Sequence, residues 1–151
     1  RAAGNRVALS LSDSFCVDRY RDEFLALVQE RVDVLFANEA EITSLYQVDS
    51  WEAARDQVRG HCEIACWTRS EKGSVIVTAD EVHEIPIHPH GGVVDTTGAG
   101  DLYAAGFLHG LTTGQDLERC GRLAALAAGE VISHYRARPE TSLAELAGTL
   151  D

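Results

Sequence analysis

DTTGAGDLYAAGF, residues 95–107, is the most informative stretch of this sequence. Gly98, Ala99 and Gly100 carry little or no side chain, so the backbone can turn tightly and approach a ligand closely. The residues after Asp101 have the spacing of an amphipathic helix, whose first amide groups lack intrahelical partners and can bind a phosphate or a developing oxyanion. From the first turn of that helix, Asp101 can accept a proton from a hydroxyl group held beside the anion.

A purely structural interpretation of the same stretch stays open. A glycine-rich turn with Asp101 as a capping or dipole-compensating acid requires no ligand. Two other phosphate motifs do not fit. The P-loop pattern Gly-x-x-x-x-Gly-Lys-Ser/Thr is absent. Gly98-x-Gly100 lacks the third glycine of a dinucleotide fingerprint, because residue 103 is a tyrosine.

The rest of the chain alternates between strand and helix patterns. Strands are predicted at residues 7–11, 32–37 and 64–68, with a hairpin formed by 74–78 and 81–87. Helices are predicted at residues 18–31, 39–46, 50–59, 101–111, 116–135 and 142–150. This order predicts an α/β fold with a mainly parallel sheet covered by helices on both faces. Ligands of such folds bind beyond the carboxyl ends of the strands, where Asn38, Thr68 and the 95–101 loop are expected.

Composition and charge narrow the class of protein. The 151 residues suit one domain, and the net charge of −11 argues against binding to nucleic acid or to an anionic membrane. No apolar run approaches the roughly 18 residues of a membrane span, and no signal peptide is recognisable. The four cysteines form no CxxC pair, which favours buried free thiols in the reducing cytosol over a zinc site. We therefore expect a cytoplasmic protein.

The beginning of the sequence is unusual. The chain contains no methionine and starts at Arg1. Residues 1–5 have the pattern of a helix end with a glycine cap that runs into the strand at 7–11. This pattern predicts that an N-terminal part of the fold precedes residue 1.

The stretch DTTGAGD, residues 95–101, resembles the Asp-Thr-x-Gly-Ala-Gly-Asp signature of the PfkB, or ribokinase-like, carbohydrate and nucleoside kinases at every specified position. The resemblance covers residues 1–151 as the C-terminal, nucleotide-binding and catalytic part of a three-layer αβα sandwich, without the N-terminal part and the small β lid. It implies that ATP donates a phosphoryl group to an alcohol, with Asp101 as the base. The amides of Gly98, Ala99, Gly100 and Asp101 would stabilise the transferring group.

Two further motifs extend the resemblance. Asn38-Glu39-Ala40-Glu41 is similar to the family's Asn-x-x-Glu, which implies that Glu41 orders Mg²⁺ through water and that Asn38 helps to place the phosphates. The alternative is a plain helix start with Asn38 as its cap. Residues 68–73 occupy the place of the nucleotide-binding Thr-x-Gly-x-x-Gly. Thr68 and Gly73 match, whereas Ser70 replaces the first glycine, where a positive φ is less comfortable, and a plain strand–turn–strand connection is the alternative.

The family often binds a monovalent cation beside the anion site. Asp95 and Thr97 match the first half of that cation site, which implies K⁺ as a further cofactor. The second half falls at residues 134–139, where Arg136 stands in place of the usual glycine. The carbonyl group survives this change, but the conformational freedom of glycine does not. The sequence therefore leaves the cation site open.

The substrate that accepts the phosphoryl group is the part of the function that the sequence determines least. Residues 11–18 and 36–42 are most similar to the bacterial adenosine-kinase-like branch, so a nucleoside acceptor is favoured. A ribose- or fructose-type sugar kinase is the main alternative, and vitamin kinases of the superfamily remain open. A chain that only binds nucleotide, without activity of its own, is a further alternative. The expected partners are small molecules and not nucleic acid or a membrane, and the longer protein could form a homodimer.

Overall fold

A computed structural model describes residues 4–150, so the first three residues of the helix end predicted at residues 1–5 lie outside the described part. It contains one five-stranded sheet with the order β1-β2-β3-β4-β5. The strands are β1 (Ala8–Ser10), β2 (Val34–Asn38), β3 (Ile64–Thr68), β4 (Ser74–Val77) and β5 (Val82–Ile85). β1, β2 and β3 run parallel, and the register pairs Asn38 with Thr68 at the carboxyl ends of β2 and β3. The predicted α/β class and mainly parallel sheet are confirmed.

The chain divides into two compact units. Unit 1 comprises residues 1–69 and 75–82, and unit 2 comprises residues 70–74 and 83–151. The predicted hairpin forms where β4 turns back into β5. There the Thr78 amide donates to the Glu81 carbonyl over 3.0 Å, and the Glu81 amide donates to the Thr78 hydroxyl over 3.0 Å. None of the helices within residues 4–150 combines the length and the apolar character needed to cross a membrane.

In the described part of unit 1, two helices follow β1 and two follow β2. They are α1 (Ser14–Arg19), α2 (Arg21–Glu30), α3 (Glu39–Tyr46) and α4 (Trp51–Val58). α4 begins as predicted, because the Ser50 hydroxyl accepts from the Ala53 amide and caps the helix. The single helix predicted at residues 18–31 is wrong. The Asp13 carboxylate starts α1 earlier by accepting from the Phe15 amide, and Tyr20, with φ −122° and ψ 36°, separates α1 from α2.

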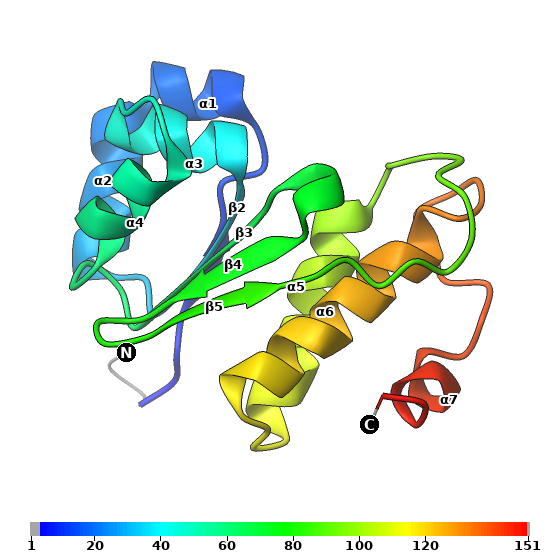
Figure 1. Cartoon of the computed structure of the whole chain (residues 1–151). Coiled ribbons are helices and arrows are strands. Elements are labelled where there is room, and N and C mark those ends of the chain that lie inside the picture. The colour runs from blue at the N-terminus through cyan, green and yellow to red at the C-terminus, as the bar shows by residue number, and fades with distance from the viewer. Residues whose placement is uncertain (1–3, 151) are drawn as a thin grey trace. The chain divides into compact units, whose positions relative to one another are not determined.

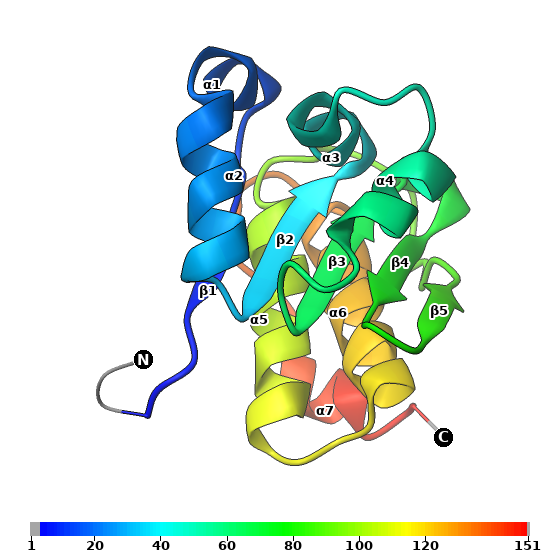
Figure 2. The ribbon, with the colours of Figure 1, turned by 90° about the vertical axis from the view of Figure 1, so that its left-hand side faces the viewer.

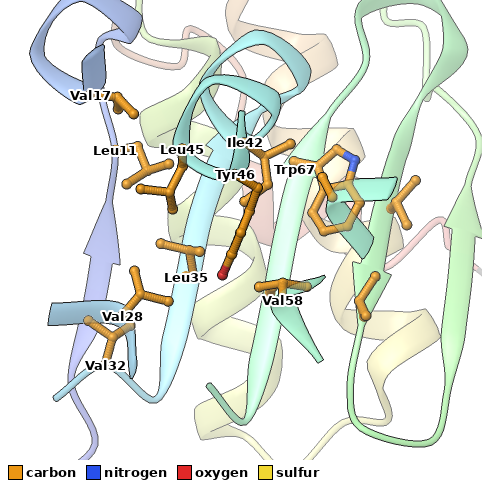
Figure 3. Close-up of a cluster of buried hydrophobic side chains, with 14 residues drawn as sticks. Leu11, Val17, Val28, Val32, Leu35, Ile42, Leu45, Tyr46, Val58 and Trp67 are labelled. Carbon is orange, nitrogen blue, oxygen red and sulfur yellow. The ribbon is translucent and has the colours of Figure 1, made fainter. Parts of the chain in front are cut away.

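The core of unit 1 lies between these helices and one face of the sheet (Figures 1 and 3). Alternate strand residues Leu35, Ala65 and Trp67 point to this face, as the period of two in a strand requires. Ile42 of α3 packs into the same cluster with residues from the other helices. The indole of Trp51 approaches that of Trp67 at 6.4 Å between ring centroids, so both tryptophans belong to this packing.

Unit 2 is built on two long helices. They are α5 (Ala99–Thr112) and α6 (Leu117–Val131), which run side by side (Figures 1 and 2). Glycines allow this close approach. A Cβ at Gly106 would lie 2.6 Å from the Leu123 carbonyl oxygen, and one at Gly110 would lie 2.9 Å from the Cys120 sulfur. α6 is extensively buried, as its alanine- and glycine-rich sequence predicts, but it ends at Val131 and not at residue 135.

The end of the described chain packs against α6. α7 (Leu143–Ala147) follows its N-cap, Ser142, whose hydroxyl accepts from the Glu145 amide, and it is shorter than the helix predicted at residues 142–150. Leucines of α6 and the C-terminal segment form a small apolar cluster: Leu123, Leu126, Leu143, Leu146 and Leu150. The Arg119 guanidinium donates to the carbonyl groups of Leu150 and Ala147 and ties the segment to the start of α6.

The cysteines correct one sequence prediction. All four are free thiols, but only Cys66 and Cys120 are buried, whereas Cys16 on α1 is exposed. Burial, assisted by the charge of Asp33, raises the pKa of Cys62 to about 12. The expectation of four buried thiols therefore fails at Cys16, because the single buried side chain of α1 is that of Val17, and at Cys62, which is only partly buried.

We expect iodoacetamide at pH 8 to alkylate Cys16 at least about tenfold faster than Cys62, because the thiolate is the nucleophile and Cys62 is both half-buried and protonated. Peptide mass spectrometry over a time course measures both rates. In concentrated urea the four cysteines should react at similar rates. Equal rates for Cys16 and Cys62 in the folded protein would contradict the assignment.

Candidate functional site

The anion loop, residues 95–101, lies in unit 2 and leads into α5. The Asp95 carboxylate accepts from the Thr97 amide over 3.0 Å and from the Thr97 hydroxyl over 2.7 Å. These two hydrogen bonds, with a smaller contribution from the Arg136 backbone, hold the pKa of Asp95 below its usual value. Asp95 is therefore an ionised side chain that fixes the turn at the start of the loop.

Gly98 is the residue at which the loop becomes a helix. It is the N-cap of α5 and has a φ of +83°, a left-handed conformation that residues with a Cβ rarely adopt. A Cβ at this position would also lie 2.7 Å from the Cβ of Ala137. Both observations explain why the motif requires glycine here.

The first amides of α5 are mostly without an acceptor in the described part of the chain. Within residues 4–150, the amides of Gly98, Gly100 and Asp101 have no hydrogen-bond acceptor. The Ala99 amide differs from the prediction, since it donates to the Thr96 carbonyl over 3.2 Å. A Cβ at Gly100 would meet no atom within 4 Å, so the space beside this residue is open. Three of the four predicted donors are therefore available to an anion.

Asp101 lies in the first turn of α5, as predicted, and its side chain is exposed. Its carboxylate makes no hydrogen bond or ion pair with any residue of the described chain. A capping acid would accept from the amides at the start of the helix, and Asp101 does not. The carboxylate is thus free to act as a base toward a group that binds beside Gly100.

Asn38 and Glu41 lie at the carboxyl end of β2, in unit 1, and form a capping box. The Asn38 side-chain oxygen accepts from the Glu41 amide over 2.8 Å, and Glu41 Oε2 accepts from the Asn38 amide over 2.9 Å. The Asn38 side-chain nitrogen donates to Glu41 Oε1 over 3.0 Å. The structural alternative of a capped helix start is therefore present. Each Glu41 oxygen accepts one hydrogen bond, which leaves lone pairs to accept from water bound to a cation.

Burial raises the pKa of Glu41, while the hydrogen bond from the Asn38 backbone lowers it and the negative charge of Asp13 raises it further. Asp13 follows β1 as Asn38 ends β2, so both lie at the same edge of the parallel sheet. Two neighbouring carboxylates repel each other and favour a cation between or beside them. Asp13 was not predicted as a site residue from the sequence; its position shortly after a strand end was the available signal.

Thr68 ends β3 at the same edge, opposite Asn38. Arg69 follows and connects two helices of unit 1. Its guanidinium donates to the Glu39 carboxylate over 3.0 Å at the start of α3, and it lies 4.4 Å from the ring centroid of Trp51 in α4. Stacking and ion pairing leave 11% of the Arg69 side chain exposed, so Arg69 stiffens the backbone next to Thr68.

The turn after Arg69 carries the strain expected from its sequence. A short 3₁₀ helix, Ser70–Lys72, starts with Ser70 at a φ of +53°, where the family motif has glycine. Gly73 has a φ of +84°, and a Cβ there would lie 2.0 Å from the Ile85 carbonyl oxygen. Gly73 is therefore required, whereas Ser70 adopts a glycine-like conformation in spite of its side chain.

Arg136, in the segment after α6, shows the same behaviour as Ser70. Its φ is +85°, so the loop keeps the conformation that glycine favours although the residue is an arginine. Within residues 4–150, no group of three or more His, Cys, Asp or Glu side chains is arranged to hold a metal ion.

Comparison with known proteins gives matches over nearly the whole chain. Residues 1–143 match the protein family described as pfkB family carbohydrate kinase. A nucleoside kinase of Methanocaldococcus jannaschii is 36% identical over 132 residues, which are 87% of this chain and 43% of that protein.

Two solved structures are more similar. The adenosine kinase from Sinorhizobium meliloti is 47% identical, with a TM-score of 0.95 over 99% of this chain and 46% of that one. A probable sugar kinase from Rhizobium etli CFN 42 is 50% identical, with a TM-score of 0.94 over 97% of this chain and 45% of that one. The chain spans less than half the length of each of these three proteins.

Proposed function

Because this chain belongs to the PfkB family of carbohydrate kinases, we propose that it is the nucleotide-binding and catalytic part of an enzyme that transfers the γ-phosphoryl group of ATP to a hydroxyl group. The observation that carries this proposal is the unpaired carboxylate of Asp101 beside the open space at Gly100. A base and a set of unused amide donors at one helix N-terminus are what phosphoryl transfer to an alcohol requires.

The roles of the residues follow from their positions. Asp101 accepts the proton of the acceptor hydroxyl while the oxygen of that hydroxyl bonds to the γ-phosphorus of ATP. The bond between this phosphorus and the bridging oxygen to the β-phosphate breaks, and ADP leaves. The amides of Gly98, Gly100 and Asp101 donate to the transferring phosphoryl group, where negative charge is spread in the transition state. Their alignment along α5 adds the positive end of the helix dipole. The Ala99 amide contributes once its hydrogen bond to Thr96 is exchanged for one to the ligand.

The remaining proposed roles concern the nucleotide and its cations. Asn38 and the Thr68–Gly73 turn, including Ser70, are proposed to bind the phosphates and the nucleotide. Glu41 would order hydrated Mg²⁺, which neutralises charge on the transferring group when it is bound. Free lone pairs on the Glu41 oxygens and the nearby charge of Asp13 support this role. Asp95 and Thr97 are proposed as part of a K⁺ site.

An adenosine-like nucleoside is the favoured acceptor. Relatives named adenosine kinase and nucleoside kinase support this choice, among them the structure from Sinorhizobium meliloti. A ribose- or fructose-type sugar is the alternative, and the probable sugar kinase from Rhizobium etli supports it. We also propose that the protein acts in the cytoplasm on small molecules, with a homodimer as one form of the longer protein.

The direct test is a kinase assay of the intact protein that contains this chain, with ATP and Mg²⁺. The acceptor panel contains adenosine, cytidine, ribose and fructose at equal concentrations. Preference for adenosine supports the adenosine-kinase-like assignment, and preference for ribose or fructose replaces it with the sugar-kinase alternative. ATP binding without transfer to any alcohol would contradict the proposed activity and favour a nucleotide-binding role.

We expect Glu41→Gln to shift the Mg²⁺ dependence of the rate to higher Mg²⁺ concentration, because a neutral amide orders a hydrated cation less well than a carboxylate. Glutamine at this position can still accept from the Asn38 amide, so the start of α3 should remain capped. The measurement is the initial rate as a function of Mg²⁺ at saturating ATP. If the rate depends on Mg²⁺ concentration in the same way in Glu41→Gln and wild type, Glu41 only caps α3 and does not order the cation.

A further inference from the structure

Glu130 is a charged residue in an unexpected place. It lies in the last turn of α6, and its side chain is completely buried, with 0% exposed. Carbonyl groups at the C-terminus of a helix form the negative end of the helix dipole and disfavour a carboxylate there. Burial adds a further cost to the charged form. Strong compensating contacts must therefore hold this side chain.

Those contacts come from the support loop, residues 132–141. Glu130 Oε1 accepts from the amides of Glu140 and Thr141, each over 2.8 Å, and His134 Nε2 lies 3.3 Å from the same oxygen. Burial opposes ionisation of Glu130, but the two amides and His134 outweigh it, so that its pKa is lower than usual. One carboxylate thus joins both ends of the support loop to α6.

The support loop in turn carries the beginning of the anion loop. The Ile132 carbonyl accepts from the amides of Val94 and Asp95, over 2.8 and 3.3 Å. The Arg136 backbone helps to stabilise the ionised Asp95 carboxylate. Ala137 lies against Gly98, at the turn where α5 begins. Three separate contacts therefore transmit the position of the support loop to the backbone of residues 94–98.

We propose that Glu130 is a positioning residue for phosphoryl transfer: it fixes the support loop, and through that loop it fixes residues 94–98 and the amide donors that follow them. In this proposal Glu130 acts indirectly. Its effect reaches the anion loop through Ile132, Arg136 and Ala137. The inference rests on the proposed kinase function. Transition-state donors must be held in place before the reaction, so loosening them should lower turnover more than substrate binding.

The test compares three variants of the intact protein. Glu130→Met keeps the length of the side chain but removes both acceptors, and Glu130→Gln keeps an acceptor for the support-loop amides without the charge. Glu118→Met is the matched control, because Glu118 is an exposed acid in the first turn of the same helix. Hydrogen exchange is followed by mass spectrometry on peptides that cover residues 93–98, 138–142 and the middle of α5 and α6.

For Glu130→Met we expect exchange of the amides of Val94, Asp95 and Thr97 to rise at least about tenfold, with the middle of α5 and α6 unchanged. The turnover number should fall on the order of tenfold or more, with the KM for the acceptor within about threefold of wild type. Glu130→Gln should restore most of the protection and turnover. Glu118→Met should behave as wild type.

Other outcomes overturn the inference. A rise confined to residues 138–142 would show that Glu130 holds only the support loop, and a rise spread over α5 and α6 would make it a general stability residue. If Glu130→Met does not fold, the folded Glu130→Gln variant tests the inference. Loss of protection from hydrogen exchange at residues 94–97 in Glu130→Gln would contradict the role of residue 130 as a hydrogen-bond acceptor for the support loop. Exchange needs no turnover, so an inactive wild-type protein with the expected exchange pattern would refute the kinase proposal and leave the link from Glu130 to the anion loop in place.

Discussion

Asp101→Asn should lower the turnover of the intact enzyme by roughly 10²–10⁴, with little change in its affinity for ATP. Asparagine keeps the size of the side chain and can still donate or accept hydrogen bonds, but it cannot take the proton of the acceptor hydroxyl. This substitution should leave the structure undisturbed, because the Asp101 carboxylate makes no hydrogen bond or ion pair within residues 4–150 that it would break. Initial rates and equilibrium binding of ATP measure the two quantities.

The matched control is Glu118→Gln, because Glu118 is the first-turn acid of α6 as Asp101 is of α5. If Asp101 only compensates the helix dipole, both variants lose a similar small stability, about 0.3–1 kcal/mol, and neither loses turnover. Turnover of Asp101→Asn within a factor of three of wild type would remove the catalytic assignment. A large loss in Asp101→Asn alone separates the base from the structural acid.

Gly106→Ala should destabilise the protein by about 2 kcal/mol. The new methyl group would lie 2.6 Å from the Leu123 carbonyl oxygen and 2.9 Å from the Ala124 Cα, and both are backbone atoms that cannot rotate away. The two helices must separate, and overpacking of this kind costs roughly 1–3 kcal/mol or more. The better helix propensity of alanine offsets up to about 1 kcal/mol of that cost. Urea unfolding followed by far-UV circular dichroism measures the net change.

Gly100→Ala is the control on the same helix. A Cβ at Gly100 meets no atom within 4 Å, so the substitution introduces no clash with the rest of the chain. We expect its free energy of unfolding to equal or slightly exceed that of wild type, because alanine favours the helix. Equal stability changes for Gly100→Ala and Gly106→Ala would show that the close contact of α5 and α6 at Gly106 is not maintained in solution.

Much of the fold could be predicted from local pattern. The strand at Ile64–Thr68 and the helix at Glu39–Tyr46 were predicted with their observed bounds, because apolar runs and caps mark both clearly. The solved relatives confirm the predicted ribokinase-like fold. The break at Tyr20 was missed, since residues on either side of it continue a helical pattern and only the backbone angles of that residue interrupt it.

The candidate site was predictable in part. The signature placed Asp101 in the first turn of a helix, and the departures from glycine at Ser70 and Arg136 coincide with left-handed backbone. The hydrogen bond that engages the Ala99 amide could not be foreseen, because it depends on the geometry of the turn at Thr96. Glu130 was also missed. A single acid on an otherwise apolar helix end was the signal, but its partners lie ten and eleven residues away in a loop without a recognisable pattern.

The contact between Trp51 and Trp67 has a consequence for spectroscopy. These are the two tryptophans of the chain, and both belong to unit 1, where Arg69 also stacks on Trp51. Indole fluorescence of this chain therefore reports on unit 1 alone, whereas far-UV circular dichroism includes the long helices of unit 2. Coincident unfolding curves from the two signals would mean that the units melt as one cooperative body. Separated curves would resolve the stability of each unit without any added label.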